Sequence, residues 1–189
     1  IDNNNFSSEI QIPLFKNDGL TSNKIKLFSC KPINNKWEVK EVNERKIKND
    51  FYILKSHEDT NSEIYFLAHE NSLIGYNHIK LEDFDNFTNT FPSYRANLKI
   101  LLKSKGGFSS YQSEYPYSMV NKKGTILSSV NSIANKDAEK NYILIKNIFE
   151  IPLIEKFNVY LVNVKLRKIE ETFSIKTNYT NCIELNNLL

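Results

Sequence analysis

Apolar and polar residues alternate along two segments in the C-terminal half of this chain. In residues 94–103 one strand face would carry Tyr94, Ala96, Leu98, Ile100 and Leu102. In residues 168–176 the apolar face would carry Ile169, Phe173 and Ile175, together with Glu171. Because successive side chains of a strand point to opposite faces, this pattern predicts antiparallel sheets with one buried and one wet face. We expect Glu171 to lie at an exposed rim, since a buried carboxylate would need a partner.

The N-terminal part contains short apolar runs separated by turn-forming residues. These runs cover residues 9–14, 24–28, 37–42, 51–54, 64–67 and 73–74. Pro13 indicates that the first run is an edge strand, because proline cannot donate to a ladder. The pair Asn34-Asn35 predicts a hairpin between the second and third runs, and the polar loop at 56–62 predicts another between the fourth and fifth. The segment therefore reads as a β-meander.

A change of pattern separates the two halves. Leu81, Phe84, Phe87 and Phe91 recur at spacings of three and four among acidic residues, before Pro92. This spacing fits one or two turns of amphipathic helix or an aromatic-anchored loop. We interpret this stretch as the connector between an N-terminal β-rich domain or subdomain, residues 1–88, and a C-terminal domain, residues 93–189.

The C-terminal part shows the rhythm of a β-sandwich. After the strand at 94–103, the glycines at 106 and 107 break the pattern and residues 108–117 are polar and aromatic. Further strands are predicted near residues 124–127, 142–145, 157–164, 168–176 and 183–185. A turn at residues 165–167 joins two of them into a hairpin. About seven strands with a turn every ten or so residues is typical of immunoglobulin-like or fibronectin-like sandwiches, although the only tryptophan, Trp37, lies in the other half. The sequence therefore predicts an all-β, mostly antiparallel fold.

Composition narrows the range of partners. The 189 residues carry a formal net charge of +3, with 25 basic and 22 acidic residues well mixed. The densest basic stretches, residues 46–48 and 99–105, are broken by apolar residues, which is typical of solvated strand faces and not of a nucleic-acid track. Heavy use of Lys, Asn and Ile beside three arginines points to an AT-rich genome. We expect no nucleic-acid partner.

Cysteine use and hydropathy leave the compartment open. Cys30 and Cys182 belong to no Cys-x-x-Cys pair, so we expect two unpaired thiols, with one disulfide as the alternative in an exported protein. No run approaches the ~20 apolar residues that span a bilayer, so no membrane span is expected. The chain starts at Ile1 without Met. Two locations therefore stay open, an exported or cell-surface protein whose signal has been removed, and a cytoplasmic protein.

Motifs of catalysis and cofactor binding are missing. His57, His69 and His78 cluster in the sequence, but the predicted hairpin keeps the first two too far apart to share an ion, so we predict no metal site. The Gly-x-Ser-x-Gly elbow, the phosphate loop and the dinucleotide fingerprint are absent, and nothing pairs two carboxylates at glycosidase spacing. We therefore expect no cofactor and favour a protein that is not an enzyme.

The segment 108–118 is the best candidate for a ligand site. It combines Tyr111, Tyr115 and Tyr117 with Gln112 and Glu114, and we add Arg95 to this candidate site. Flat aromatic faces beside fixed hydrogen-bonding groups bind sugars and peptides, although the tyrosines could equally fold onto the core. The sequence thus favours a non-catalytic binding module for a glycan or a protein. The alternatives are an enzyme acting on a polysaccharide or small polar substrate, and an assembly protein of a surface layer or virus particle.

Overall fold

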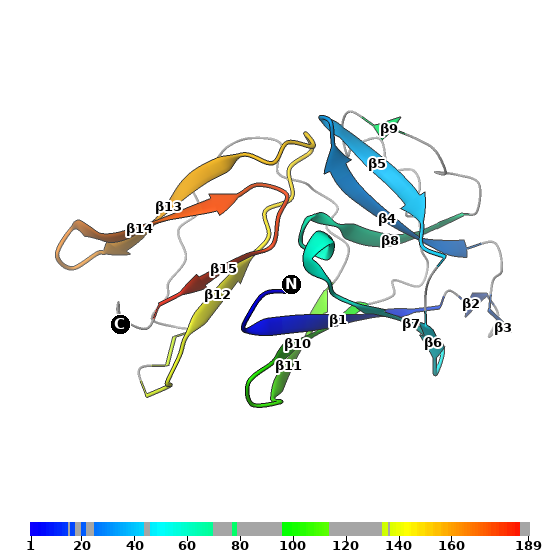
Figure 1. Cartoon of the computed structure of the whole chain (residues 1–189), viewed down its shortest axis with the longest axis horizontal. Helices are drawn as coiled ribbons and strands as arrows, with labels where there is room; N and C mark the ends of the chain where they lie inside the picture. Colours follow the sequence, from blue (N-terminus) through cyan, green and yellow to red (C-terminus); the bar gives the residue numbers. More distant parts are fainter. Residues whose placement is uncertain are drawn as a thin grey trace.

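The computed structural model describes residues 1–14, 16–17, 20–21, 25–43, 46–69, 77–78, 96–113, 134–135 and 137–185. Across these residues the fold is all-β with antiparallel sheets, as predicted, apart from one 3-10 turn, η1 (Glu58–Ser62) (Figure 1). The N-terminal strands are β1 (Phe6–Pro13), β2 (Lys16–Asn17), β3 (Leu20–Thr21), β4 (Ile25–Ile33), β5 (Lys36–Glu41), β6 (Lys46–Lys48), β7 (Phe51–Lys55), β8 (Ile64–His69) and β9 (Asn77–His78). They are followed by β10 (Ala96–Leu102), β11 (Phe108–Ser113), β12 (Tyr142–Ile145), β13 (Lys156–Asn163), β14 (Lys168–Lys176) and β15 (Asn181–Glu184).

Two sheets face each other in the larger part of the molecule. A five-stranded sheet has the order β11-β10-β1-β7-β6, and a four-stranded sheet has the order β8-β4-β5-β9. Their facing sides share one core, to which Tyr52 and Leu54 come from the first sheet and Leu27 and Leu67 from the second. Burial of these apolar side chains is the main force that holds the two layers together.

The hairpin predicted between residues 51–54 and 64–67 is wrong. Strand β7 pairs with β1 and β6, whereas β8 pairs with β4 in the other sheet. Turn η1 carries the chain from one sheet to the other, so Leu54 and Leu67 meet across the core and are not side by side in one sheet. A compact apolar run is buried whether its strand pairs with the next strand in a hairpin or lies in the opposite sheet. The composition of the run therefore could not distinguish these two arrangements.

The structure confirms two other predicted hairpins. Strands β4 and β5 pair through a turn in which Asn34 and Asn35 have φ of 50° and 60°, the left-handed backbone that two-residue hairpin turns require. Strands β13 and β14 pair around the predicted turn at residues 165–167. Strand β1 is not an edge strand, since it lies between β10 and β7. Pro13 is tolerated there because it is the last residue of the strand.

The second face of the four-stranded sheet is covered by the chain after β12. Phe28, Cys30, Trp37, Val39 and Phe66 form a core on this face, and Ile148 packs against it. The Trp37 indole Nε1 donates a hydrogen bond to the carbonyl of Glu150, at 2.7 Å. Residues 146–150 therefore connect the larger part of the molecule to its C-terminal strands.

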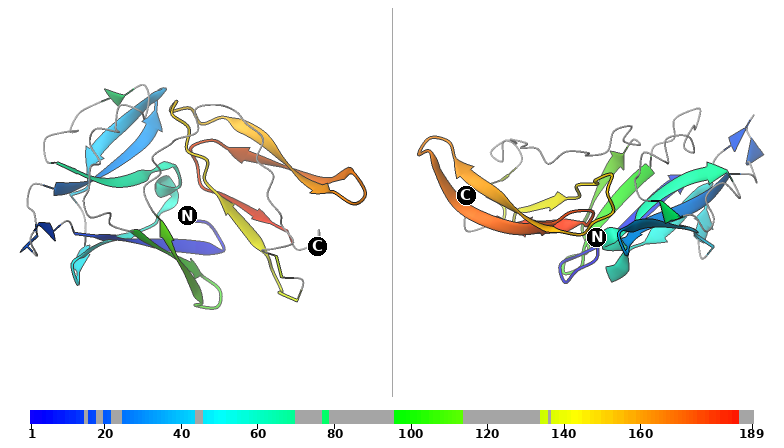
Figure 2. Two further views of the ribbon diagram at one scale, coloured as in Figure 1. Left: turned by 180° about the vertical axis from the view of Figure 1, so that it is seen from behind. Right: turned by 90° about the horizontal axis from the view of Figure 1, so that it is seen from above.

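The C-terminal strands form two separate two-stranded sheets, β12-β15 and β13-β14. Ile175 and Ile183 share a core with Phe157 and Ile143, which packs the base of β13-β14 against β12-β15. The outer part of β13-β14 extends beyond this core as an arm (Figure 2). Glu171 on this arm is exposed, as expected for a rim position.

The immunoglobulin-like or fibronectin-like sandwich predicted for residues 93–189 is not confirmed. The hairpin β10-β11 falls within that range, yet it pairs with β1 at the N-terminal end of the chain. One sheet thus draws strands from both sides of the predicted boundary at residues 88–93, and the division into domains stays a prediction. The strand predicted at residues 124–127 and the connector at 79–92 lie outside the described residues.

Candidate functional site

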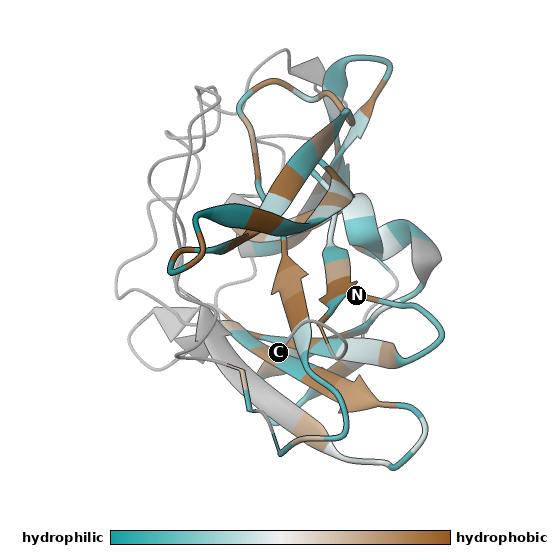
Figure 3. Cartoon of the chain, turned by 90° about the vertical axis from the view of Figure 1, so that its left-hand side faces the viewer, coloured by the Kyte–Doolittle hydropathy of each residue, from teal (hydrophilic) through white to brown (hydrophobic). Residues whose placement is uncertain are grey.

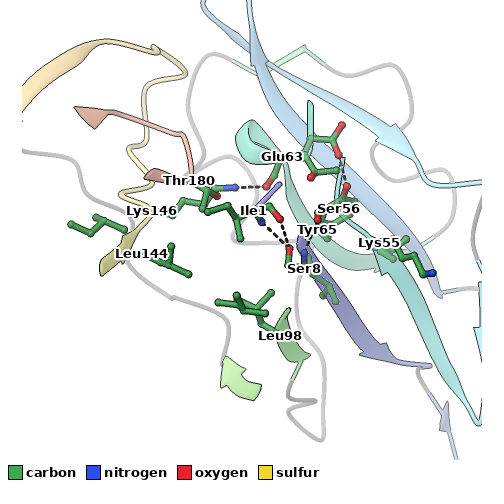
Figure 4. A pocket seen from close by; sticks show the side chains of 15 residues that line it. Ile1, Ser8, Lys55, Ser56, Glu63, Tyr65, Leu98, Leu144, Lys146 and Thr180 are labelled. Atoms are coloured by element: carbon green, nitrogen blue, oxygen red, sulfur yellow. Dashed lines mark hydrogen bonds between the residues drawn. The ribbon is translucent and has the colours of Figure 1, made fainter. Parts of the chain in front are cut away.

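A pocket of about 230 Å³ lies where β12 approaches the five-stranded sheet (Figure 4). Its apolar walls are Ile10, Leu54, Leu98, Ile100 and Leu144. Its polar groups come from Ser8, Lys55, Ser56, Thr60, Glu63, Tyr65, Lys146 and Thr180. We call this space the Lys146 pocket, after the cation that follows β12.

Lys146 is held at the pocket by one hydrogen bond. Its ammonium Nζ donates to the backbone carbonyl of Glu63 at 2.5 Å. Within the described part of the chain this carbonyl is the one acceptor that Lys146 reaches, although an ammonium group carries three donors. Burial lowers the pKa of Lys146 to about 8, because desolvation disfavours the charged form more than nearby Cys30 and Glu63 support it. The amine is thus mostly protonated at pH 7.

Glu63 and Tyr65 form a second polar pair at the same end of the pocket. The Tyr65 hydroxyl donates to the Glu63 carboxylate. Burial, the hydrogen bond and the charge of this carboxylate all raise the pKa of Tyr65, so the phenol stays protonated at neutral pH. The carboxylate is therefore engaged by a neutral donor, and Lys146 bonds the carbonyl of Glu63 and not its side chain.

The chain positions this polar end through local backbone contacts. Ser8 and Ser56 join β1 to the end of β7, because the amide of Ser8 donates to the Ser56 hydroxyl and the amide of Ser56 donates to the Ser8 carbonyl, both at 2.7 Å. Thr60 in η1 accepts the amide of Glu63 at 3.1 Å and so fixes the residue that precedes β8. Turn η1, which the sequence did not predict, therefore positions the Glu63 carbonyl that accepts the hydrogen bond from Lys146.

A larger hollow adjoins the pocket. It measures about 690 Å³ and shares Leu98, Ile100 and Leu144 with the Lys146 pocket. Its other walls include Phe6, Leu102, Phe108, Tyr142, Ile143 and Leu185. The two spaces together offer apolar surface next to the ammonium group of Lys146. The N-terminal ammonium of Ile1 also lines the pocket, where it donates to the Ser8 hydroxyl at 2.7 Å, and burial lowers its pKa to about 6.

The predicted ligand residues are only partly described. Tyr111 and Gln112 lie in β11, opposite Leu98 and Asn97 of β10, and the positions of their side chains are not described. Arg95, Glu114, Tyr115 and Tyr117 lie outside the described residues. The structure therefore does not test whether these six residues form one site.

The three histidines and the two cysteines lie at separate places in the described structure. His57 precedes η1, His69 ends β8 and His78 ends β9, and the described ranges hold no group of three metal-ligating side chains. Cys30 and Cys182 are both free thiols, as expected. Burial raises the pKa of Cys30 to about 12, which makes it a core residue and not a nucleophile.

Sequence reasoning missed Lys146, Glu63 and Tyr65. One signal was present, because Lys146 directly follows the apolar run Tyr142–Ile145 and is followed shortly by Ile148. A lysine inside such a run marks a buried cation, but the residues it meets come from distant parts of the chain.

Comparison with known proteins adds no relative. No family model matches the sequence, and no curated protein or solved structure is similar enough to count as a match. No helix in the described ranges is long and apolar enough to cross a membrane.

Proposed function

We propose that this chain is a non-catalytic binding module that holds a small amphipathic molecule, an apolar chain ending in a carboxylate, in the Lys146 pocket. The observation that carries the proposal is a half-buried ammonium group, with donors to spare, at one end of a pocket with aliphatic walls. Ligand pockets are typically apolar, with a few polar groups that fix the orientation of the ligand.

The size of the pocket limits the ligand. A dry apolar cavity of ~150 Å³ accommodates benzene, so about 230 Å³ accommodates a somewhat larger apolar group. A medium-chain carboxylic acid such as octanoate fits this size, and a longer chain could continue into the adjoining hollow along Leu98 and Leu144.

The charges near the pocket favour a carboxylate head. Lys146 supplies a cation, and the carboxylate of Glu63, which keeps its negative charge, is held by the Tyr65 hydroxyl. Exposed Lys55 adds a second positive charge to the lining. A charge-assisted hydrogen bond between an ammonium and a carboxylate is stronger than a neutral one and would use a donor that is free in the described structure.

This proposal keeps the binding module predicted from the sequence and changes its ligand. Glycans are bound on flat aromatic faces, whereas the walls here are Ile and Leu side chains. A glycan or protein ligand at Tyr111, Tyr115 and Tyr117 stays a prediction, as do the immunoglobulin-like sandwich, the enzyme and the assembly protein.

Isothermal titration calorimetry with octanoate tests the proposal. We expect saturable one-to-one binding at pH 7 that weakens tenfold or more for octanol, which lacks the carboxylate, in line with the ~1.5–3 kcal/mol of a charged hydrogen bond. The Lys146→Met variant should bind octanoate as weakly as the wild type binds octanol, and the matched surface variant Lys36→Met should bind normally. Equal affinity for octanoate and octanol, or full binding by Lys146→Met, would contradict the assignment.

A further inference from the structure

Exposed apolar side chains gather on the arm formed by β13 and β14. Tyr160, Val162, Val164, Leu166 and Ile169 are each between 44% and 74% exposed. The base of the same arm is covered, since Phe157, Val159 and Phe173 pack into the C-terminal core. Along β13 half-buried residues alternate with exposed ones, so Tyr160 and Val162 lie on the strand face that points away from this core. Figure 3, which faces this side of the molecule, shows apolar and polar bands alternating along the hairpin.

The arm presents these side chains in a fixed arrangement. Val162 pairs directly with Ile169 across the two strands, so both lie on one face, and Tyr160 lies on that face two residues further back. At the turn, the Asn163 side chain accepts the amide of Leu166 at 3.0 Å and donates to the Glu170 carboxylate at 2.9 Å. The tip is thus an ordered turn that projects Val164 and Leu166 outwards.

Basic residues are interleaved with these apolar ones. Residues 164–169 contain Lys165, Arg167 and Lys168 and no acidic residue. Lys168 forms an ion pair with Glu170 at 2.9 Å, which leaves Lys165 and Arg167 as the exposed charges of the turn itself. The exposed carboxylates of Glu170 and Glu171 follow directly, so the excess positive charge is confined to the turn. An apolar turn that carries two cations matches a surface that is apolar inside and anionic outside.

We propose that the tip of the β13-β14 arm, residues 162–169, inserts into the surface of an anionic phospholipid membrane. The length of the exposed tip agrees with the depth to which peripheral proteins enter a membrane. Val164 lies two residues beyond Val162 and four beyond Tyr160, which at ~3.3 Å per residue corresponds to roughly 7 Å and 13 Å. Apolar groups of peripheral proteins bury ~5–10 Å into the headgroup and acyl boundary, so Val162 would reach that boundary and Tyr160 would lie at headgroup level, where tyrosine is enriched.

A bilayer suits the tip better than a protein pocket does. Apolar side chains occur on one strand face and also around the turn, so a protein partner would have to enclose the tip from several sides. A lipid surface adapts to such a shape, and the two basic residues of the turn add electrostatic attraction to anionic lipids to the burial of its apolar side chains.

Vesicle co-sedimentation of the full chain tests this proposal. We expect binding to vesicles of equal parts phosphatidylcholine and phosphatidylserine, little binding to pure phosphatidylcholine, and weaker binding as salt increases. Replacing both exposed tip charges (Lys165→Gln with Arg167→Gln) should weaken binding to the anionic vesicles about thirtyfold, at ~1 kcal/mol per basic residue. Replacing both turn aliphatics (Val164→Asn with Leu166→Asn) should weaken it more than tenfold, since burying such a side chain contributes ~1.5–3 kcal/mol.

The β6-β7 hairpin offers a matched control. Its exposed Ile47 and Lys48 provide one apolar and one basic residue beside a turn, and Ile47→Asn with Lys48→Gln should leave vesicle binding unchanged. The proposal is overturned if the wild type ignores anionic vesicles, or if the tip variants bind as the control does. It is also overturned if Leu166 proves necessary for self-association in size-exclusion chromatography without lipid, since the tip would then be an interface between copies. None of these results depends on octanoate binding, so the two proposals fail separately.

Discussion

Replacing Lys146 by methionine should separate binding from stability. The lysine binds the proposed ligand, but its protonated form is also costly in the folded state. Burial lowers its pKa from 10.5 to about 8, and at ~1.36 kcal/mol per unit this makes the charged form about 3 kcal/mol less favourable in the folded protein. Methionine has a similar length and no charge, so Lys146→Met removes this cost.

The loss of one hydrogen bond opposes the gain. The variant leaves the Glu63 carbonyl without its ammonium donor, which costs about 2 kcal/mol for a buried acceptor. We therefore expect the free energy of unfolding at pH 7 to rise by about 1 kcal/mol, while octanoate binding falls. Gains of this kind are common when a buried charge is replaced by an apolar side chain.

The advantage of Lys146→Met in unfolding free energy should reverse with pH. Below pH 8 Lys146 is protonated in both states, so its cost is fully present. Between pH 8 and 10.5 the unfolded chain binds more protons than the folded one, and linkage then makes the wild type more stable as the pH rises. Lys146→Met lacks this contribution, so its advantage at pH 7 should become a disadvantage near pH 10. Cys30 and Tyr65, whose pKa values are raised, lower the stability of both proteins above about pH 9. The loss from Cys30 is somewhat larger in Lys146→Met, because the lysine charge opposes the rise in the pKa of this thiol, so it adds to the expected disadvantage.

Urea unfolding followed by the fluorescence of the single tryptophan, Trp37, provides the assay. Wild type, Lys146→Met and the exposed-lysine control Lys36→Met are compared at pH 7 and pH 10. A loss of more than 2 kcal/mol at pH 7 with an unchanged pH slope would show that Lys146 is a structural tether between β12 and η1, and that our account of its charge is wrong.

Two further predictions concern the connection between the halves of the chain and the thiols. Asn178 is buried with φ of 50°, and its side chain accepts the amide of Phe149 and donates to the carbonyls of Ile151 and Leu153. Asn178→Ala should therefore lower the unfolding free energy by about 3–4 kcal/mol, because it removes three hydrogen bonds and places alanine in a left-handed backbone. The control Asn34→Ala, at an exposed left-handed position, should lower it by about 1 kcal/mol. A loss below about 1 kcal/mol for Asn178→Ala would contradict the role of Asn178 in this connection. The second prediction concerns alkylation of the native protein with iodoacetamide, followed by mass spectrometry. We expect Cys182, which is partly exposed, to be modified before Cys30, which lies in the core with a pKa of about 12. Labelling of Cys30 before Cys182 would contradict the packing around Cys30.

The sequence predicted what local pattern determines. Alternation identified β13 and β14, and the Asn34-Asn35 pair identified the turn between β4 and β5, because each depends on neighbouring residues alone. It also located Glu171 at an exposed rim. These features need no knowledge of which strand lies next to which.

Partners distant in sequence could not be predicted in this way. Strand β1 pairs with β10 across some ninety residues, and no periodicity encodes that choice. The Lys146 pocket depends on it, since Ile10 and Leu98 become neighbours only when these strands pair. The alternation predicted the β13-β14 hairpin but not which of its side chains stay exposed, because it does not reveal which strand face the core covers.

The titration of Lys146 itself tests the central claim most directly. The ε-methylene resonance of this lysine can be recognised by its absence from the spectrum of Lys146→Met, and its chemical shift can be followed with pH by NMR. We predict a pKa of about 8 in the free protein and a higher value with saturating octanoate, because a bound carboxylate favours the charged amine. A pKa near the ordinary value of 10.5, or one that octanoate leaves unchanged, would contradict the proposal that this lysine binds the head of the ligand.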